Sequence, residues 1–560
     1  MILLSLKKRL SLPITSWQLC LLATIIGALS ALLIVGFTIT INLIQQLYLS
    51  EKDNYSSLDE LSRFVMPIIG VLIILLCSWF TGYKYLSTGI PFVLHRLKVA
   101  HGIIPLRNTI NQFVGSAIAL ATGFSVGREG PAIHLGAALS GYFGNLLRLP
   151  HNSMRTLCAC GIAAGISASF NTPLAAVIFV MEVILREYKV HIFIPIMMAS
   201  LVGSMITSSA LGPALELEYF TDIALDLAHF PVLIVFAFVM GIIAFVFNKT
   251  LVTVIKKASK LHVVVRLLIA ALITGVLSYA VPQALGTNLG AISFSLGESA
   301  SLSFLIALLA AKLTMTIFAL GLGIPGGAIG PILGIGAIAG SCAAMLVRYY
   351  FPEVVLTNDL ALMGMAGMMA ATLNAPLAAL IAVVELSNQL EIIVPAMIVI
   401  ATACIVSGQF FGNRSLFVMQ LEVQNLIYRK PPLEKSLQRI GALGVMNENI
   451  TIFNQLSSSD KLEQIKQLDD KTLLLDTVNN PETQKNAYYW IQGSSDPDNP
   501  ALMNHLLLPL NAQSTLVDAY LLLVKKRNGG VYIYGDHEDD VLGVITFEQI
   551  RLFLIEGKIR

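Results

Sequence analysis

A long apolar sequence extends from about Trp17 to Phe411, and glycine and proline residues interrupt it repeatedly. Hydrophobic residues make up 56% of the chain and charged residues only 12%, whereas a soluble domain carries about 25% charged residues. A single soluble core could not bury so much apolar surface, so we expect lipid to surround it. The sequence therefore predicts an all-α protein that crosses a membrane many times.

The interruptions are as informative as the apolar segments. A helix that crosses a bilayer needs about 20 apolar residues, but several segments, such as 65–80 and 109–124, are shorter. Irregular backbone at membrane depth is tolerated only where protein covers it or where it lines a water-filled cavity. Broken segments therefore favour a transport pathway. A membrane-embedded enzyme or receptor is the alternative, but the apolar segments contain no Ser/His pair or paired aspartates that would support catalysis.

Two segments of the apolar sequence repeat each other without gaps. Residues 161–183 and 364–386 share the motif Asn-x-Pro-Leu-Ala-Ala, and each continues to a glutamate, Glu182 or Glu385. Two related halves with breaks at corresponding positions are typical of transporters built from repeats. We interpret the two glutamates as structural partners.

Three stretches rich in glycine and proline lie at or before the start of apolar segments, at 87–91, 127–131 and 323–331. Proline favours the first turn of a helix, and glycine lets the backbone approach a ligand closely. A helix N-terminus offers unpaired N–H groups and roughly half a positive charge, so it can bind an anion without a formal cation. A cation pathway would instead need acidic rings or exposed carbonyl oxygens. The three breaks therefore predict an anion pathway.

The composition divides the chain into three regions. Residues 1–16 contain the basic cluster Lys7-Lys8-Arg9, which favours a cytoplasmic N-terminus. Residues 17–425 form the predicted membrane domain, with halves at about 17–211 and 230–425. The polar remainder predicts a separate cytosolic domain.

Residues 430–560 predict this cytosolic α/β domain, and its last third has the clearest pattern. A helical pattern from Leu516 to Lys525 precedes two strand-like runs, 531–534 and 541–546, and a final helix. The six cysteines lie in apolar stretches, so we expect neither disulfides, a metal site nor a cofactor. The net charge of +2 gives no support for nucleic-acid binding, which requires a clustered basic face.

With these motifs, residues 15–425 resemble the CLC family of chloride channels and transporters. The resemblance rests on the three breaks, the Asn-x-Pro-Leu-Ala pair and Asn-Arg-Ser-Leu-Phe at 413–417. It implies an inverted-repeat homodimer in the lipid bilayer of a plasma or inner membrane. Each subunit would hold one pathway for chloride or for other small anions such as fluoride or nitrate. Both termini would be cytoplasmic, and the protein would not be an enzyme. The family's anion site falls on Ser87, Gly127, Arg128, Glu129, Gly130, Ala328, Ile329 and Phe417.

The resemblance assigns the gate to Glu129. A carboxylate beside an anion-binding helix end can take the place of the anion, and protonation would let it swing away. An ionisable group inside the membrane is functional by default. Ser87 would donate its hydroxyl to a central chloride, and the N–H groups of Ala328 and Ile329 would complete the site. We expect Arg128 to form a structural pair.

Two positions depart from the family's pattern. Val183 stands where proton-coupled exchangers have an internal acid, and valine cannot carry a proton. Phe417 stands where many members have a tyrosine whose hydroxyl faces the central anion. Val183 favours a passive channel gated by voltage or pH, whereas Glu129 and the compact membrane domain favour a Cl⁻/H⁺ antiporter, so both remain open. We expect His134 to be a packed helix histidine rather than a proton relay.

The C-terminal region resembles the paired CBS modules that follow many CLC membrane domains. Residues 505–560 match the second module, through 529–533 and 542–546, more clearly than residues 434–495 match the first. Nucleotide-binding copies usually place an aspartate three residues after the threonine, where this chain has Gln549. We therefore expect a dimer-stabilising or regulatory role rather than nucleotide binding.

Overall fold

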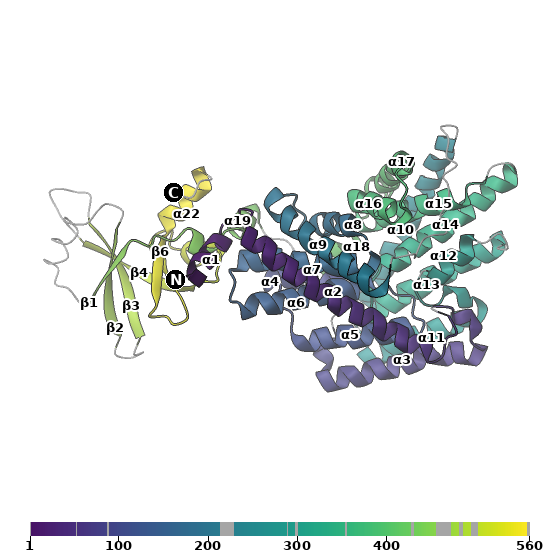
Figure 1. The fold of residues 1–560 in the computed structure, drawn as a ribbon, viewed down its shortest axis with the longest axis horizontal. Coiled ribbons are helices and arrows are strands. Elements are labelled where there is room, and N and C mark those ends of the chain that lie inside the picture. The colour runs from purple at the N-terminus through teal and green to yellow at the C-terminus, as the bar shows by residue number, and fades with distance from the viewer. Residues whose placement is uncertain are drawn as a thin grey trace. The chain divides into compact units, whose positions relative to one another are not determined.

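The computed structural model describes residues 2–51, 53–86, 89–212, 229–287, 289–296, 301–352, 355–426, 431–454, 472–480, 485–493 and 502–556. The chain forms two compact units, which Figure 1 draws together. One unit, here the helical unit, comprises Cys20–Phe143 and Thr156–Tyr428. The other, here the C-terminal unit, comprises Met1–Leu19, Gly144–Arg155 and Arg429–Arg560.

The apolar sequence folds into a series of helices, several of which are short or broken. In chain order they are α2 (Trp17–Gln46), α3 (Glu60–Thr81), α4 (Gly89–Val99), α5 (Leu106–Ala121), α6 (Glu129–Leu146), α7 (His151–Phe170), α8 (Pro173–Phe179), α9 (Val190–Leu211), α10 (Phe230–Ala258), α11 (Val263–Ala280), α12 (Leu289–Leu296), α13 (Leu302–Leu322), α14 (Ile329–Tyr350), α15 (Thr357–Leu373), α16 (Pro376–Ser387), α17 (Ile393–Ile405) and α18 (Leu416–Val423). Turns of π-helix extend α8 over Val180–Leu185 and α17 over Val406–Phe410.

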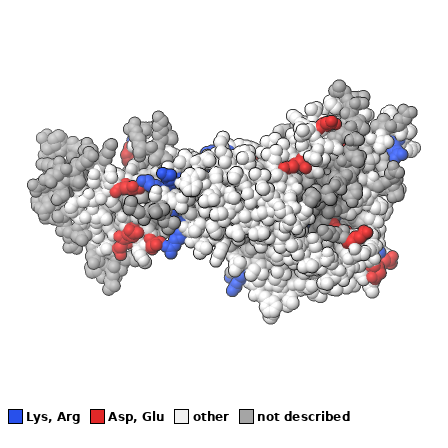
Figure 2. Space-filling view, in the orientation of Figure 1, with Lys and Arg blue, Asp and Glu red and all other residues white. Residues whose placement is uncertain are grey.

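Many of these helices are suited to lipid. Within the described residues, eight helices are long and apolar enough to cross a membrane. Figure 2 shows a face of the helical unit that carries few charged side chains. In contrast, α14 is 83% buried over its most apolar window and forms the centre of the unit together with α15. The predicted polytopic helical fold with broken helices is therefore confirmed.

The two halves of the helical unit use the same breaks. Asn171 follows α7 and Asn374 follows α15, and both have left-handed backbone, with φ of 55° and 53°. A helix that begins with proline then starts two residues later, at Pro173 or Pro376. Asparagine tolerates this conformation better than most residues do, and proline favours the first helical turn. The repeated Asn-x-Pro motif therefore produces the same sharp turn twice.

Glycines bring neighbouring helices into close contact in both halves. A Cβ atom at Gly136 would lie 2.1 Å from the carbonyl oxygen of Gly161, and one at Gly336 would lie 2.3 Å from that of Gly364. These pairs join α6 to α7 and α14 to α15. Since real Cβ contacts are never so short, larger residues would force each pair apart. The close packing fixes the directions of α6 and α14, whose first residues form the site described below.

The C-terminal unit contains a six-stranded sheet in the order β1-β2-β3-β4-β5-β6. The strands are β1 (Ile450–Asn454), β2 (Leu473–Asn480), β3 (Lys485–Gly493), β4 (Leu502–Asn511), β5 (Gly530–Tyr534) and β6 (Val541–Thr546). Parallel pairs join β1 to β2 and β4 to β5, and the other neighbours are antiparallel. Helix α21 (Leu516–Leu523) connects β4 to β5, and α22 (Phe547–Glu556) follows β6. The helix–strand–strand–helix pattern predicted for the last third is confirmed.

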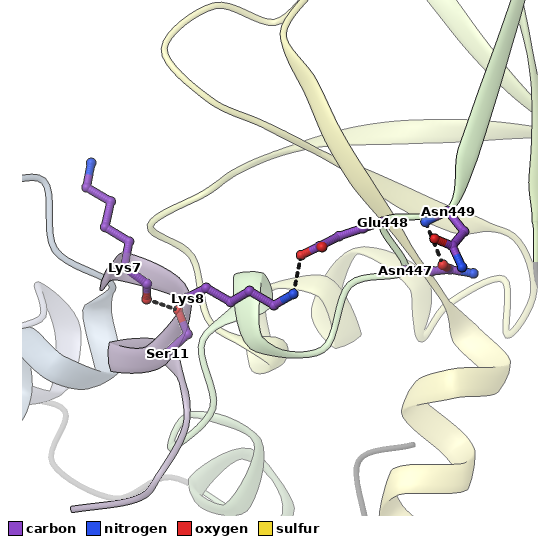
Figure 3. A network of polar contacts seen from close by, with 6 residues as sticks. All are labelled: Lys7, Lys8, Ser11, Asn447, Glu448 and Asn449. Carbon is purple, nitrogen blue, oxygen red and sulfur yellow. Dashed lines mark hydrogen bonds and ion pairs between the residues drawn. The ribbon is translucent and has the colours of Figure 1, made fainter. Parts of the chain in front are cut away.

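The N-terminal helix α1 (Ile2–Ser11) and the connection between α6 and α7 also belong to the C-terminal unit. The amide of Asn152 donates to the carbonyl oxygens of Leu10 and Ser11, both at 3.1 Å. The N–H of Gly441 donates to the carbonyl oxygen of Ser11 at 2.8 Å. Figure 3 shows the accompanying ion pair between Lys8 and Glu448. Three segments that are distant in sequence therefore fold together.

Candidate anion pathway

Backbone hydrogen bonds join the second and third glycine-rich breaks. The N–H of Gly127 donates to the carbonyl oxygen of Gly327 at 2.8 Å, and the N–H of Gly327 donates to that of Gly127 at 2.7 Å. This isolated antiparallel bridge lies just before the first residues of α6 and α14. The starts of two helices, one from each half of the chain, are therefore held side by side.

Close backbone contacts bring the first break to the same place. A Cβ atom at Gly130 would lie 2.6 Å from the carbonyl oxygen of Gly326, and one at Gly89 would lie 3.7 Å from the same oxygen. Gly89 begins α4 with φ of 84°, a conformation that L side chains rarely adopt. Its N–H donates to Oε1 of Gln112 at 2.9 Å. The first turns of α4, α6 and α14 thus converge, as an anion site built from helix ends requires.

Glu129 lies inside this convergence. It is the first residue of α6 and is only 2% exposed. A Cβ atom at Gly127 would lie 1.9 Å from Oε2 of Glu129, and one at Gly327 would lie 2.6 Å from it. The carboxyl group is therefore folded back over the paired glycines. Because each helix start carries roughly half a positive charge, the carboxylate occupies a place that also suits an anion.

The remaining predicted site residues lie at or near the helix starts, with one outside the described residues. Ala328 caps α14 and Ile329 begins it, and both are at least 94% buried. Phe417, in the first turn of α18, is 2% exposed and belongs to the same buried cluster as Ala328 and Ile329. Ser87 lies outside the described residues. The described part of the first break, 89–91, forms the start of α4.

The side chain of Arg128 interacts with Phe170 and Asp53. Its guanidinium lies over the ring of Phe170, 5.8 Å from the ring centroid, and it interacts electrostatically with Asp53. Asp53 lies in the connection between α2 and α3 and accepts hydrogen bonds from the N–H and the hydroxyl of Thr287. Burial raises the pKa of the Asp53 carboxyl, and the Thr287 hydrogen bonds oppose that shift. These contacts suit a structural cation.

Four further residues noted in the sequence lie outside the three glycine-rich breaks, two of them half-buried and two buried. Glu182 and Glu385 accept hydrogen bonds from the starts of α16 and α8. Val183 lies in the π-helical turn after α8 and is 3% exposed. His134 lies on α6 and is fully buried. The structure therefore gathers the glycine-rich residues around Glu129 and leaves these side chains outside that contact.

The sequence analysis missed Gly326 and Gly327 as partners of the second break. A signal for them exists, because Gly-x-x-Gly-Pro occurs at 127–131 and again at 327–331. Glu129 of the first copy corresponds to Ile329 of the second. The two copies are the segments that the backbone bridge joins. One copy carries an ionisable group, and the other carries an apolar residue.

The sequence of the chain is similar to known transport proteins. A family model described as "Voltage gated chloride channel" matches residues 69–408. The H(+)/Cl(-) exchange transporter ClcA of Salmonella paratyphi B is 25% identical over 424 residues, which cover 72% of this chain and 88% of the relative. The protein of the same name from Salmonella typhi has the same identity and coverage.

Solved structures share the fold. A slow cyanobacterial Cl-/H+ antiporter matches with a TM-score of 0.65 and 21% identity, covering 73% of this chain and 98% of the other. A CLC-type fluoride/proton antiporter matches with a TM-score of 0.61 and 22% identity, covering 72% and 97%. A eukaryotic CLC transporter has a TM-score of 0.60 and 17% identity but covers 95% of this chain and 98% of its own.

Proposed function

Because the chain belongs to the voltage gated chloride channel (CLC) family, we propose that it exchanges chloride for protons across a membrane, with Glu129 as the gate. One observation carries this proposal: the Glu129 carboxyl is folded over the hydrogen-bonded pair Gly127–Gly327, between the starts of two helices. A carboxylate at that position competes with chloride for the same N–H groups. Protonation removes its charge and with it the competition.

The chemistry of the helix starts supports an anion rather than a cation. The groups available around Gly127, Gly130, Ala328 and Ile329 are backbone N–H donors at the positive ends of α6 and α14. Partial charges hold an ion less tightly than a buried lysine or arginine would, so the ion can leave again. Conduction requires such moderate binding. The cation nearest in sequence, Arg128, is engaged with Phe170 and Asp53.

Exchange is preferred over passive conduction because of the gate and the relatives. Glu129 is an ionisable group that can accept a proton inside the membrane, and such groups often form proton relays. The similar Salmonella proteins are H(+)/Cl(-) exchange transporters, which supports exchange in this chain. A passive chloride channel gated by voltage or pH is the second candidate. Val183 favours it, because valine replaces the internal acid of the proton-coupled members.

The proposed assembly is a homodimer in a plasma or inner membrane, with both termini in the cytoplasm. The cluster Lys7-Lys8-Arg9 supports the orientation of the N-terminus. Helices α8 and α16 are too short to cross a bilayer, and Leu174 and Leu377 at their starts are 47% and 41% exposed. A second subunit covering these starts would remove them from lipid.

The C-terminal unit is proposed to be a CBS-like regulatory or dimer-stabilising domain. Its clearer module is the one that contains α21, β5, β6 and α22. Nucleotide binding is not proposed, because the position of the usual ribose-binding aspartate holds Gln549. The side-chain oxygen Oε1 of Gln549 accepts a hydrogen bond from the backbone N–H of Thr546 at 2.9 Å. The backbone N–H of Gln549 donates to the Thr546 hydroxyl at 3.2 Å. This reciprocal pair caps the start of α22.

Purified protein in lipid vesicles tests the exchange. An outward chloride gradient is imposed with no pH gradient, and chloride and proton movements are recorded together. We expect protons to enter the vesicles as chloride leaves in the wild type, so that a pH gradient builds up. Glu129→Gln, which resembles the protonated side chain, should keep chloride flux and lose proton movement. Chloride flux without proton movement in the wild type would identify a channel. Unchanged coupling in Glu129→Gln would remove the gate assignment.

A further inference from the structure

His134 is a buried ionisable residue that neither the anion site nor the gate uses. It lies five residues after Glu129 on α6, a rise of about 7.5 Å along the helix. Its side chain is 0% exposed, and its ring stacks on Phe92 of α4 with centroids 5.8 Å apart and an interplanar angle of 10°. The ring is thus packed, as the sequence analysis expected.

Packing does not account for the two ring nitrogens. Neither Nδ1 nor Nε2 of His134 has a hydrogen-bond partner among the described residues. A neutral imidazole has one N–H donor and one acceptor, and each buried group left unsatisfied costs about 1–3 kcal/mol. Such groups are few in native proteins, and they often mark a functional role or bound water. A phenylalanine would fill the same space without the cost of unsatisfied polar groups.

Three other ionisable groups of the helical unit are engaged in hydrogen bonds. The carboxylates of Glu182 and Glu385 each accept two backbone N–H groups. The ammonium of Lys312 donates to three backbone carbonyl oxygens at 3.0 to 3.1 Å. Val183 supplies no ionisable group at all. In the part of the chain that the structure describes, His134 is a buried group with no hydrogen-bond partner at either proton-binding atom.

The direction of α6 gives His134 a place on a proton route. The helix begins at Glu129 and ends at Leu146, and its last residues belong to the C-terminal unit, which includes Gly144–Arg155. If that unit is cytoplasmic, as proposed above, His134 lies on the cytoplasmic side of the gate. Water molecules that formed hydrogen bonds with the two ring nitrogens would also connect the ring to Glu129 on one side and to the cytoplasm on the other.

We propose that His134 carries protons between Glu129 and the cytoplasm, in place of the acid missing at Val183. The inference rests on the proposed exchange function. A proton released by the Glu129 carboxyl binds one ring nitrogen through water, and the other nitrogen releases its proton toward the cytoplasm. One proton enters the ring for each that leaves, so the imidazole returns to its neutral form. A neutral imidazole is suited to this task because one of its nitrogens accepts a proton while the other donates one.

The test compares proton and chloride fluxes of the full chain in lipid vesicles. In His134→Asn, we expect proton flux to fall by about a hundredfold or more, the range that proton-transfer groups contribute, while chloride flux persists. His134→Gln is a second variant in case the first does not fold, and a monodisperse elution profile checks both. Phe92→Leu is the matched control, because it removes the ring stack and keeps the histidine.

Two further results separate a relay from packing. Adding Val183→Glu to His134→Asn should restore proton flux, because the acid returns to the position used by other exchangers. If Phe92→Leu instead reproduces the loss and Val183→Glu does not reverse it, His134 acts by packing and the relay is overturned. Normal coupling in a folded His134→Asn or His134→Gln also overturns it and leaves exchange intact. A wild type without proton movement removes the exchange proposal, and the relay falls with it.

Discussion

Glu182 and Glu385 occupy equivalent positions in the two halves, and each carboxylate caps the first turn of a helix in the other half. Glu182 accepts from the N–H groups of Leu377 and Ala378 in α16 at 3.3 and 2.6 Å. Glu385 accepts the corresponding pair in α8 at 3.0 and 2.7 Å. Each helix start thereby gains an anionic partner without exposing its N–H groups to lipid.

This reciprocal capping predicts a loss of stability when either carboxylate is neutralised. Hydrogen bonds to a charged group contribute about 1.5–3 kcal/mol, more than neutral ones. Glu182→Gln and Glu385→Gln should therefore each lower the thermal unfolding temperature in detergent by a similar amount, because the two contacts are nearly equivalent. Chloride flux per folded molecule should change little. Two variants as stable as the wild type would contradict the capping role.

The space around Gly127 predicts an altered gate when a methyl group is added. A Cβ atom there would lie 1.9 Å from Oε2 of Glu129, so Gly127→Ala must displace the carboxyl group from the glycine pair. We expect faster chloride flux with weaker proton coupling. Gly327→Ala should act in the same direction more mildly, since its distance is 2.6 Å. The control is Gly36→Ala in α2, where no atom lies within 4 Å of the added Cβ.

The aromatic ring at Phe417 predicts a gain in anion affinity when a hydroxyl is added. The ring is 2% exposed within the cluster that contains Ala328 and Ile329. Phe417→Tyr would place a donor in this apolar environment, and a net hydrogen bond of about 0.5–1.5 kcal/mol corresponds to roughly two- to twelvefold tighter chloride binding. Isothermal titration calorimetry measures the change, and Phe417→Leu is the control without a donor. Equal affinities for Tyr and Phe would place the ring outside the central anion's reach.

The contacts of α1 predict different effects from two substitutions. Asn152 is partly buried and donates to two backbone carbonyl oxygens of α1. The Lys8–Glu448 ion pair is 46% exposed at both side chains, and exposed pairs contribute little. Asn152→Ala should therefore release α1 to limited proteolysis, whereas Lys8→Met should leave it protected. Protection of α1 in Asn152→Ala would show that the remaining contacts hold the helix alone.

Local patterns in the sequence predicted the membrane helices well. The apolar span 17–47 corresponds to α2, Trp17–Gln46, and the turn residues at Asn171 and Asn374 were visible as Asn-x-Pro motifs. Each of these motifs separates two helices, α7 from α8 and α15 from α16. The short helix α12 was missed, since eight residues give too little periodicity, whereas the stretch at 87–91 marked the start of α4.

Contacts between distant segments could not be predicted in the same way. The bridge between Gly127 and Gly327 depends on the packing of two halves, and glycine has no side chain whose pattern could indicate a partner. The association of α1 with Asn152 and Gly441 likewise joins three remote segments through backbone atoms. The short connection between α6 and α7 folds with the C-terminal unit, and no local pattern in the sequence indicates this association.

The Gly127–Gly327 bridge also constrains the order of events during synthesis. The start of α6 and its glutamate are made two hundred residues before the backbone that pairs with them, and the cap of α8 at Glu385 is made later still. A nascent chain must therefore hold half-finished helix ends in the bilayer until translation reaches the second repeat. Fragments that stop earlier cannot assemble any part of the bridge, so truncation should abolish the route altogether instead of leaving a leaky half-pore.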